Sequence, residues 1–168
     1  DGFYPETQRL IPVTFENELV VDSRDLLNAI DRASFIKNDG VSIIRLSAHP
    51  ERVVISTRSQ EVGSSTEEIL PEAFEGNGIN ISFSGRYVYE AIRVLNASTI
   101  KISFSGEMKP FIITNVDDSS ILQLVLPVRA RKLTLTVHNL SSHRSTAAVG
   151  IAGVEDEACI VHFIFPLT

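Results

Sequence analysis

Cysteine and long hydrophobic runs are scarce in this sequence. Its single cysteine, Cys159, excludes an internal disulfide and fits the reducing cytosol, so we expect a cytoplasmic protein. No apolar run approaches the ~18 residues that a membrane-spanning helix needs, and no signal-peptide pattern opens the chain. The sequence therefore predicts that a membrane is not among the partners of this protein.

Basic residues are also fewer than acidic ones. Fifteen Lys and Arg residues stand against 21 Asp and Glu residues, which gives a formal net charge of -6. This charge excludes a generally basic nucleic-acid binder, so any contact with DNA must come from local segregation of charge. The length fits one domain, with or without an appendage. Because the chain starts at Asp1 rather than Met, we expect a processed, truncated or partial product.

Catalytic and metal-binding motifs are missing as well. His49, His138, His143 and His162 are scattered, without the H-E-x-x-H or C-x-x-C partners of a metal site. Cys159 and His162 lie in an apolar run that predicts a strand, so their spacing does not indicate a nucleophile and its base. The stretch "EGNGIN" precedes a strand rather than a helix, which excludes a phosphate-binding loop. We predict no metal, no cofactor and no enzyme active site.

What the sequence does contain is a repeat of strand, helix and two strands. Residues 17–34 read "NELVVDSRDLLNAIDRAS" and residues 78–96 read "GINISFSGRYVYEAIRVLN". Ser23 and Ser84 are the predicted N-caps of the two helices. Strand pairs follow, with turns near 49–51 and 106–107, and the second copy ends at 121–128. The repeat predicts a pseudo-symmetric α+β domain with two helices side by side on antiparallel sheet.

Both predicted helices are amphipathic. Their apolar faces are predicted to consist of Leu26, Leu27, Ile30 and Ala33 in the first helix, and Tyr87, Val88, Ala91, Val94 and Leu95 in the second. The polar faces share a set of arginines, namely Arg24, Arg32, Arg86 and Arg93. Two interpretations stay open: a solvated surface, or weak and salt-sensitive contacts with DNA phosphates.

Several segments together resemble a known family: "YPETQRLIP", "LLNAIDRAS", "NISFSGRYVYEAIRVL", "KISFSGEMKPFIITN" and "ILQLVLPVR". They resemble the third domain of the bacterial replicative sliding clamp, the beta subunit of DNA polymerase III, in its low-GC Gram-positive form. The resemblance covers about residues 3–129 and implies a DNA clamp-like fold. Protomers of that family have three similar domains, and two protomers close into a ring around duplex DNA, with helices lining the hole. It implies a non-catalytic processivity factor, a subunit of a polymerase holoenzyme.

The resemblance also implies a hydrophobic pocket that binds short peptides of DNA polymerase, the clamp loader and repair proteins. The matching positions are Pro5, Arg9, Leu10, Val41, Ser84, Tyr87, Met108, Pro110, Leu124, Val125, Leu126, Pro127, Val128 and Arg129. Val41 matches less closely because the loop length differs, and Ser84 stands where other members can have asparagine. Judged without the resemblance, Tyr87, Leu124 and Leu126 are more typical of core residues. Part of the family's pocket belongs to a preceding domain, which we expect to be missing here.

A homodimer interface is implied by two further groups of residues. Phe35 and Ile36 follow the first helix, and the acidic positions are Glu61, Glu67 and Glu68. The glutamates fit a solvated loop equally well. Because we expect the first two domains to be absent, this chain alone should not close a ring. Two other interpretations stay open: a small enzyme with a scattered active site, and a degenerate clamp fragment without independent function.

The expected organisation has three parts: a linker at 1–12, the clamp domain at 13–130, and an extension at 131–168 that matches no part of the family. The extension contains "KLTLTVH", whose alternation predicts a half-buried strand, and "ACIVHFIFPL", which is apolar on both faces. We expect the second segment to shelter at the peptide pocket, where it would compete with outside peptides, or at an open sheet edge. The extension could be non-native, from a fusion or an altered reading frame, or a natural appendage.

Overall fold

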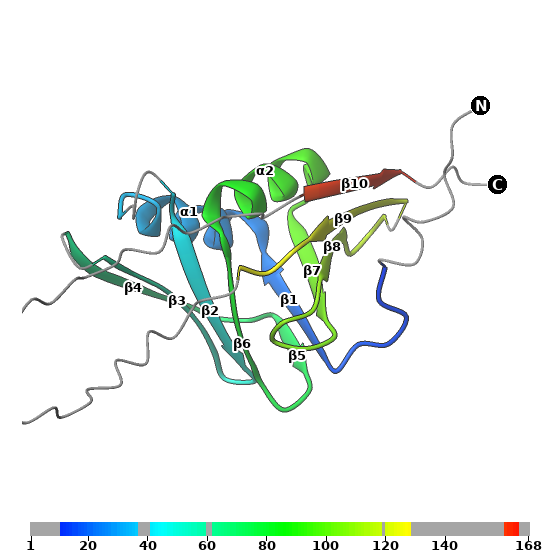
Figure 1. The fold of residues 1–168 in the computed structure, drawn as a ribbon. Helices are drawn as coiled ribbons and strands as arrows, with labels where there is room; N and C mark the ends of the chain where they lie inside the picture. Colours follow the sequence, from blue (N-terminus) through cyan, green and yellow to red (C-terminus); the bar gives the residue numbers. More distant parts are fainter. Residues whose placement is uncertain (1–10, 37–40, 60–61, 119, 129–159, 165–168) are drawn as a thin grey trace, which may run out of the picture.

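A computed structural model describes residues 11–36, 41–59, 62–118, 120–128 and 160–164. Within these residues the chain forms two helices and ten strands (Figure 1). In chain order they are β1 Asn17–Asp22, α1 Ser23–Ala33, β2 Ile43–His49, β3 Arg52–Ser59, β4 Gly63–Ile69, β5 Ala73–Glu75, β6 Ile79–Ser84, α2 Gly85–Leu95, β7 Thr99–Phe104, β8 Phe111–Asn115, β9 Ile121–Val125 and β10 Ile160–Ile164. Neither described helix is long and apolar enough to cross a membrane.

The two copies of the repeat build two sheets by exchanging their first strands. One sheet has the order β4-β3-β2-β6, and the other contains β9-β8-β7-β1. Each sheet thus takes three strands from one copy and the first strand of the other copy. Every pairing is antiparallel. This exchange produces the predicted pseudo-symmetric α+β domain, and β5 and β10 extend the second sheet to six strands.

The helices lie side by side and cover one side of both sheets (Figure 1). Helix α1 contacts β1, β3 and β4, whereas α2 contacts β6, β8 and β9. Three aromatic rings join the sheets beneath them: Phe111 lies 5.9 Å from Phe83 of the four-stranded sheet and 5.4 Å from Phe104 of its own sheet. All three side chains are at most 1% exposed. Such tilted aromatic contacts add to the stabilisation that burial provides.

The helix starts follow the prediction, but their caps do not. Helix α1 is capped by Asp22, whose Oδ1 accepts hydrogen bonds from the backbone N–H groups of Arg24 at 2.8 Å and Asp25 at 3.1 Å. The predicted cap Ser23 is wrong by one residue, because the carboxylate one position earlier satisfies these donors and also interacts well with the helix dipole. Ser84 does occupy the N-cap position of α2, yet its side chain makes no capping hydrogen bond.

Two further differences concern exposure and a missed strand. Val94 is 52% exposed rather than part of the buried stripe of α2, and Ile92, at 1% exposed, lies in that stripe instead.

Strand β4, with the sequence "GSSTEEI", was not predicted because Ile69 is its only apolar residue. It forms because β3 supplies a continuous pairing partner over its whole length.

The glycine-rich stretch "EGNGIN" leads into a strand, β6, as predicted, and the chain turns there. Gly76 and Gly78 have φ angles of 121° and 108°, which only glycine adopts readily. The Oδ1 atom of Asn17 accepts the backbone N–H of Gly78 at 3.0 Å and fixes the turn against β1.

The predicted strand near the C-terminus is confirmed for Ile160–Ile164. This strand, β10, pairs antiparallel with β9, so that Ile160 lies opposite Val125 and Ile164 lies opposite Ile121. Of its two predicted locations it therefore occupies the sheet edge rather than the peptide pocket. The other predicted strand, at 132–138, falls outside the described residues.

Candidate functional site

Residues predicted to bind peptides come together where the two sheets meet. The chain leaving β9 crosses to the other sheet, because the backbone N–H of Val128 donates to the carbonyl oxygen of Ser82 at 2.8 Å. This bond brings 126–128 beside the end of β6 and hence beside Ser84. Nearby, the N–H of Gly85 donates to the carbonyl oxygen of Ser42 at 2.9 Å, which holds the segment after Val41 at the start of α2.

A third segment joins them from the turn between β7 and β8. Phe111 pairs with Val125 across β8 and β9, so Pro110 and the turn before it lie next to Leu126. The backbone N–H of Lys109 donates to the carbonyl oxygen of Gly106 at 3.3 Å and closes this turn. Residues from β6, α2, the β7–β8 turn and the end of β9 are thus gathered by backbone pairing alone.

The gathered residues differ in how much surface they present. Met108 is 56% exposed, and Tyr87, Leu126 and Pro127 are partly exposed. Leu124 and Val125, at 0% and 1%, have no surface to offer a ligand. They support the site from within the sheet, where Leu124 packs with Ile112, Leu122, Ile11 and Phe15 in a second small core. The predicted residues Pro5, Arg9, Leu10 and Arg129 fall outside the described residues.

The four predicted DNA-facing arginines are all exposed on the two helices. Arg32 Nη2 lies 3.0 Å from Glu67 Oε2, and Arg86 Nε lies 3.1 Å from Glu90 Oε1. The guanidinium of Arg93 lies 6.0 Å from the centre of the Tyr89 ring, at the outer limit of a cation–π contact. Part of their positive charge is therefore already matched within the domain.

Residues predicted for a dimer interface lie around the end of α1 and on β4. Phe35 is 82% exposed, which is unusual for so large an apolar side chain, and Ile36 is partly exposed. Glu67 pairs with Arg32, whereas Glu68 is exposed on β4, the outermost strand of its sheet. Glu61 falls outside the described residues.

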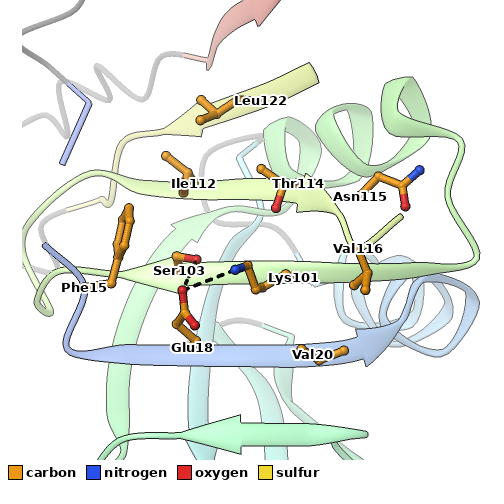
Figure 2. Close-up of a pocket in the computed structure, with 10 residues that line it drawn as sticks. All are labelled: Phe15, Glu18, Val20, Lys101, Ser103, Ile112, Thr114, Asn115, Val116 and Leu122. Carbon is orange, nitrogen blue, oxygen red and sulfur yellow. Dashed lines mark hydrogen bonds and ion pairs between the residues drawn. The ribbon is translucent and has the colours of Figure 1, made fainter. Parts of the chain in front are cut away.

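A hollow of about 340 Å³ on the outer face of the six-stranded sheet was not predicted (Figure 2). Its walls combine apolar side chains with an ion pair: Lys101 Nζ lies 3.4 Å from Glu18 Oε1, which also accepts a hydrogen bond from Ser103 Oγ at 3.2 Å. It is lined by Phe15, Glu18, Val20, Lys101, Ser103, Ile112, Thr114, Asn115, Val116 and Leu122. None of these residues belongs to the predicted peptide site. Because side chains alternate between the two faces of a sheet, the sequence of each strand could have shown which of them point outward.

Metal-ligand clusters and shifted pKa values are the two features of interest among the titratable side chains of the described residues. No group of three or more His, Cys, Asp or Glu residues among them could hold a metal ion. Hydrogen bonds from the Ser120 hydroxyl and then its backbone N–H hold the pKa of Asp118 below its ordinary value. Asp118 lies between β8 and β9, where this interaction organises a turn of the backbone.

Comparison with known proteins identifies the family. Residues 8–129 match the family model described as DNA polymerase III beta subunit, C-terminal domain. The beta sliding clamp of Bacillus subtilis (strain 168) is 44% identical over 131 residues, covering 77% of this chain and 35% of the relative. The beta sliding clamp of Staphylococcus epidermidis is 38% identical over 130 residues, covering 77% and 34%. The chain belongs to the DNA polymerase III beta subunit family and corresponds to its C-terminal domain.

Solved structures agree with the predicted clamp-like fold. The DNA polymerase sliding clamp from Bacillus subtilis has a TM-score of 0.73 at 44% identity, covering 77% of this chain and 34% of that one. The beta subunit from the DNA polymerase of Streptococcus pyogenes has a TM-score of 0.71 at 31% identity, covering 77% and 35%. The relatives support the predicted Gram-positive type, and the chain spans about a third of their length.

Proposed function

We propose that this chain acts as the C-terminal domain of a bacterial sliding clamp, a non-catalytic module that tethers DNA polymerase to DNA in the cytoplasm. The observation that carries this proposal is the 44% identity with the beta sliding clamp of Bacillus subtilis over 131 residues. Identity at this level, together with a TM-score of 0.73, supports a shared role as well as a shared fold.

The domain's part in that role is to bind short peptides of DNA polymerase, the clamp loader and repair proteins. Support comes from the meeting of three separate segments around Tyr87, Met108 and Leu126, which presents partly exposed apolar surface beside rigid Pro127. A flexible methionine next to aliphatic and aromatic side chains suits an apolar peptide anchor. Arg9 and Arg129 would stand at the rim and orient peptide carbonyl or carboxylate groups.

Contact with DNA would come from the paired helices. Arg24, Arg32, Arg86 and Arg93 lie on helices that cover the same side of the domain (Figure 1), which supports contacts with the phosphate backbone rather than with bases. The ring that encloses duplex DNA would need a homodimer of longer chains, in which Phe35 and Ile36 face the partner. The exposed position of Phe35 supports that part of the proposal.

The proposal is tested by titrating the chain with a peptide that carries the clamp-binding segment of a DNA polymerase, with binding followed by calorimetry. We expect saturable binding of one peptide per chain. A scrambled peptide of the same composition is the control and should not bind. Equal heats for the two peptides would contradict the proposed peptide site.

A further inference from the structure

Gly85, the first residue of α2, is a glycine whose backbone gives no reason for it. It is the only described glycine whose φ angle is not positive, so its conformation is open to any residue. In a helical conformation glycine is less favourable than alanine, because glycine loses more conformational freedom on folding. The reason for a glycine at this position must therefore lie in the packing around it.

Two neighbours occupy the space that a side chain at Gly85 would need. A Cβ atom there would lie 2.6 Å from Cδ1 of Ile44 in β2 and 3.0 Å from Oγ of Ser34 at the end of α1. Nonbonded carbon atoms at optimal separation are about 3.5–4.0 Å apart. Only a residue without a side chain lets α2 begin this close to β2 and to the end of α1.

Both neighbours are held in place by contacts of their own. Ile44 is 0% exposed and belongs to the large core cluster, where a change of rotamer would displace other packed side chains. Ser34 Oγ donates a hydrogen bond to the carbonyl oxygen of Ile30 at 2.7 Å. A methyl group added at Gly85 should therefore displace the start of α2 rather than these two side chains.

The start of α2 carries Tyr87, which is partly exposed among the residues of the proposed peptide site. Two contacts fix this turn without a side-chain cap, since Ser84 makes no capping bond. One is the hydrogen bond from the Gly85 N–H to the carbonyl oxygen of Ser42 at 2.9 Å, and the other is the close packing of Gly85 on Ile44. Both depend on how closely Gly85 approaches β2.

The other side chains of the site are placed independently of this turn. Leu126 and Met108 are positioned by the pairing of β8 with β9 and by the crossing of the chain at Val128. A displaced start of α2 would therefore change the position of Tyr87 relative to them, and the apolar surface would no longer match one peptide.

We propose that Gly85 is a positioning residue of the peptide site, which sets the place of Tyr87 by allowing α2 to begin in direct contact with Ile44. Gly85 acts through Tyr87 and does not itself contact the peptide. This inference rests on the proposed peptide-binding function, and it assigns a role in binding to a residue that lines no surface.

The test is a cycle of three variants of the full chain: Gly85→Ala, Ile44→Val, and the two changes together. Ile44→Val removes the Cδ1 methyl group, the atom closest to the added Cβ, and leaves the rest of the side chain in place. Calorimetry measures the affinity for the polymerase-derived peptide, and NMR measures the amide shifts of Ser84–Val88. Unchanged amide shifts in β1 and β7 show that the domain remains folded.

Gly85→Ala should weaken peptide binding by about tenfold, because anchor side chains at the centre of an interface carry most of its binding energy. It should also shift the amides of Ser84–Val88. Ile44→Val alone should bind like the original chain. The double variant should recover most of the affinity and the original shifts, a non-additive result that marks direct contact between the two positions.

Three results would overturn the proposal: undiminished affinity in Gly85→Ala, a double variant that binds as weakly as Gly85→Ala, or a Gly85→Ala chain that does not fold, which would make the role purely structural. The proposed peptide function fails in a different way. If the amide shifts move in Gly85→Ala and return in the double variant while even the original chain does not bind the peptide, Gly85 still positions the turn and the peptide-binding function is wrong.

Discussion

The backbone N–H of Val128 donates a 2.8 Å hydrogen bond to the carbonyl oxygen of Ser82. Val128 follows β9 of the six-stranded sheet, whereas Ser82 lies in β6, the edge strand of the four-stranded sheet, so the bond connects the two sheets. As a result Leu126 and Pro127 are held beside the turn that contains Met108. The proposed peptide site depends on this crossing.

Leu126→Asp should weaken binding of a polymerase-derived peptide by at least ~2 kcal/mol, because a charge would replace an apolar anchor at the centre of the site. Calorimetry measures the change. Val116→Asp is the matched control, since Val116 is 50% exposed and lines the separate hollow on the outer face. A folded Leu126→Asp variant with undiminished affinity would mean that the pocket lies elsewhere.

Asp22→Ala should lower the free energy of unfolding by about 1 kcal/mol, because two backbone N–H groups at the start of α1 lose their acceptor. Urea denaturation measures the loss. Ser84→Ala, at the equivalent position of α2, should change stability far less, since the Ser84 side chain makes no capping bond. Equal losses in the two variants would contradict this account of the caps.

Gln123→Leu should raise the free energy of unfolding by about 1 kcal/mol or more, because it removes a buried amide that has no hydrogen-bond partner among the described residues. Its shift in urea midpoint should be opposite in sign to that of Gln123→Glu, which buries a charge at the same place. A destabilised Gln123→Leu variant would show that the amide has a partner that the described residues do not include.

Ser120→Ala should raise the pKa of Asp118 towards its ordinary value, because the Ser120 hydroxyl is the first cause of its depression. A pKa lowered by folding adds stability that is present at neutral pH and disappears as the pH falls through the folded-state value. NMR titration of the Asp118 carboxyl carbon in both chains measures the shift. Identical titration curves would rule out the hydroxyl as the cause.

DNA binding by this chain alone should be weak, independent of sequence and sensitive to salt. With ~4 phosphate contacts at most, the logarithm of affinity should fall with the logarithm of salt concentration with a slope of about -4 or shallower. Because Arg32 and Arg86 already pair with glutamates, we expect a slope shallower than about -4. Fluorescence anisotropy with two unrelated duplexes measures this, and tight binding to only one of them would be inconsistent with backbone contacts.

The repeat, both helices and most strands could be predicted because their apolar residues recur with helical or strand periods. Asp22 was missed as a cap because several polar residues adjoin the start of α1 and only backbone geometry selects between them. Strand β4 was missed since its stability comes from pairing with β3 rather than from its own sequence. The exchange of β1 and β6 between sheets is a non-local pairing, which periodicity does not encode.

The candidate site could be predicted from the sequence only through the family resemblance. Ser84, Met108 and Leu126 are far apart in the chain, and what unites them is the crossing at Val128 and the pairing of β8 with β9. The hollow on the outer face could not be predicted from the sequence for the same reason, because its residues are also far apart in the chain. Glu18 and Lys101 meet there because β1 pairs with β7, although more than eighty positions separate them.

The most direct test of the central claim is NMR shift mapping of the isotopically labelled chain with the polymerase-derived peptide. The account predicts saturable shifts confined to the end of β6, the first turn of α2, the β7–β8 turn and 126–128. Thr114, Val116 and the rest of the outer hollow should not move. Absence of saturable shifts, or shifts centred on the hollow or on the β9 edge, would contradict the assignment of this domain as a peptide-binding clamp module.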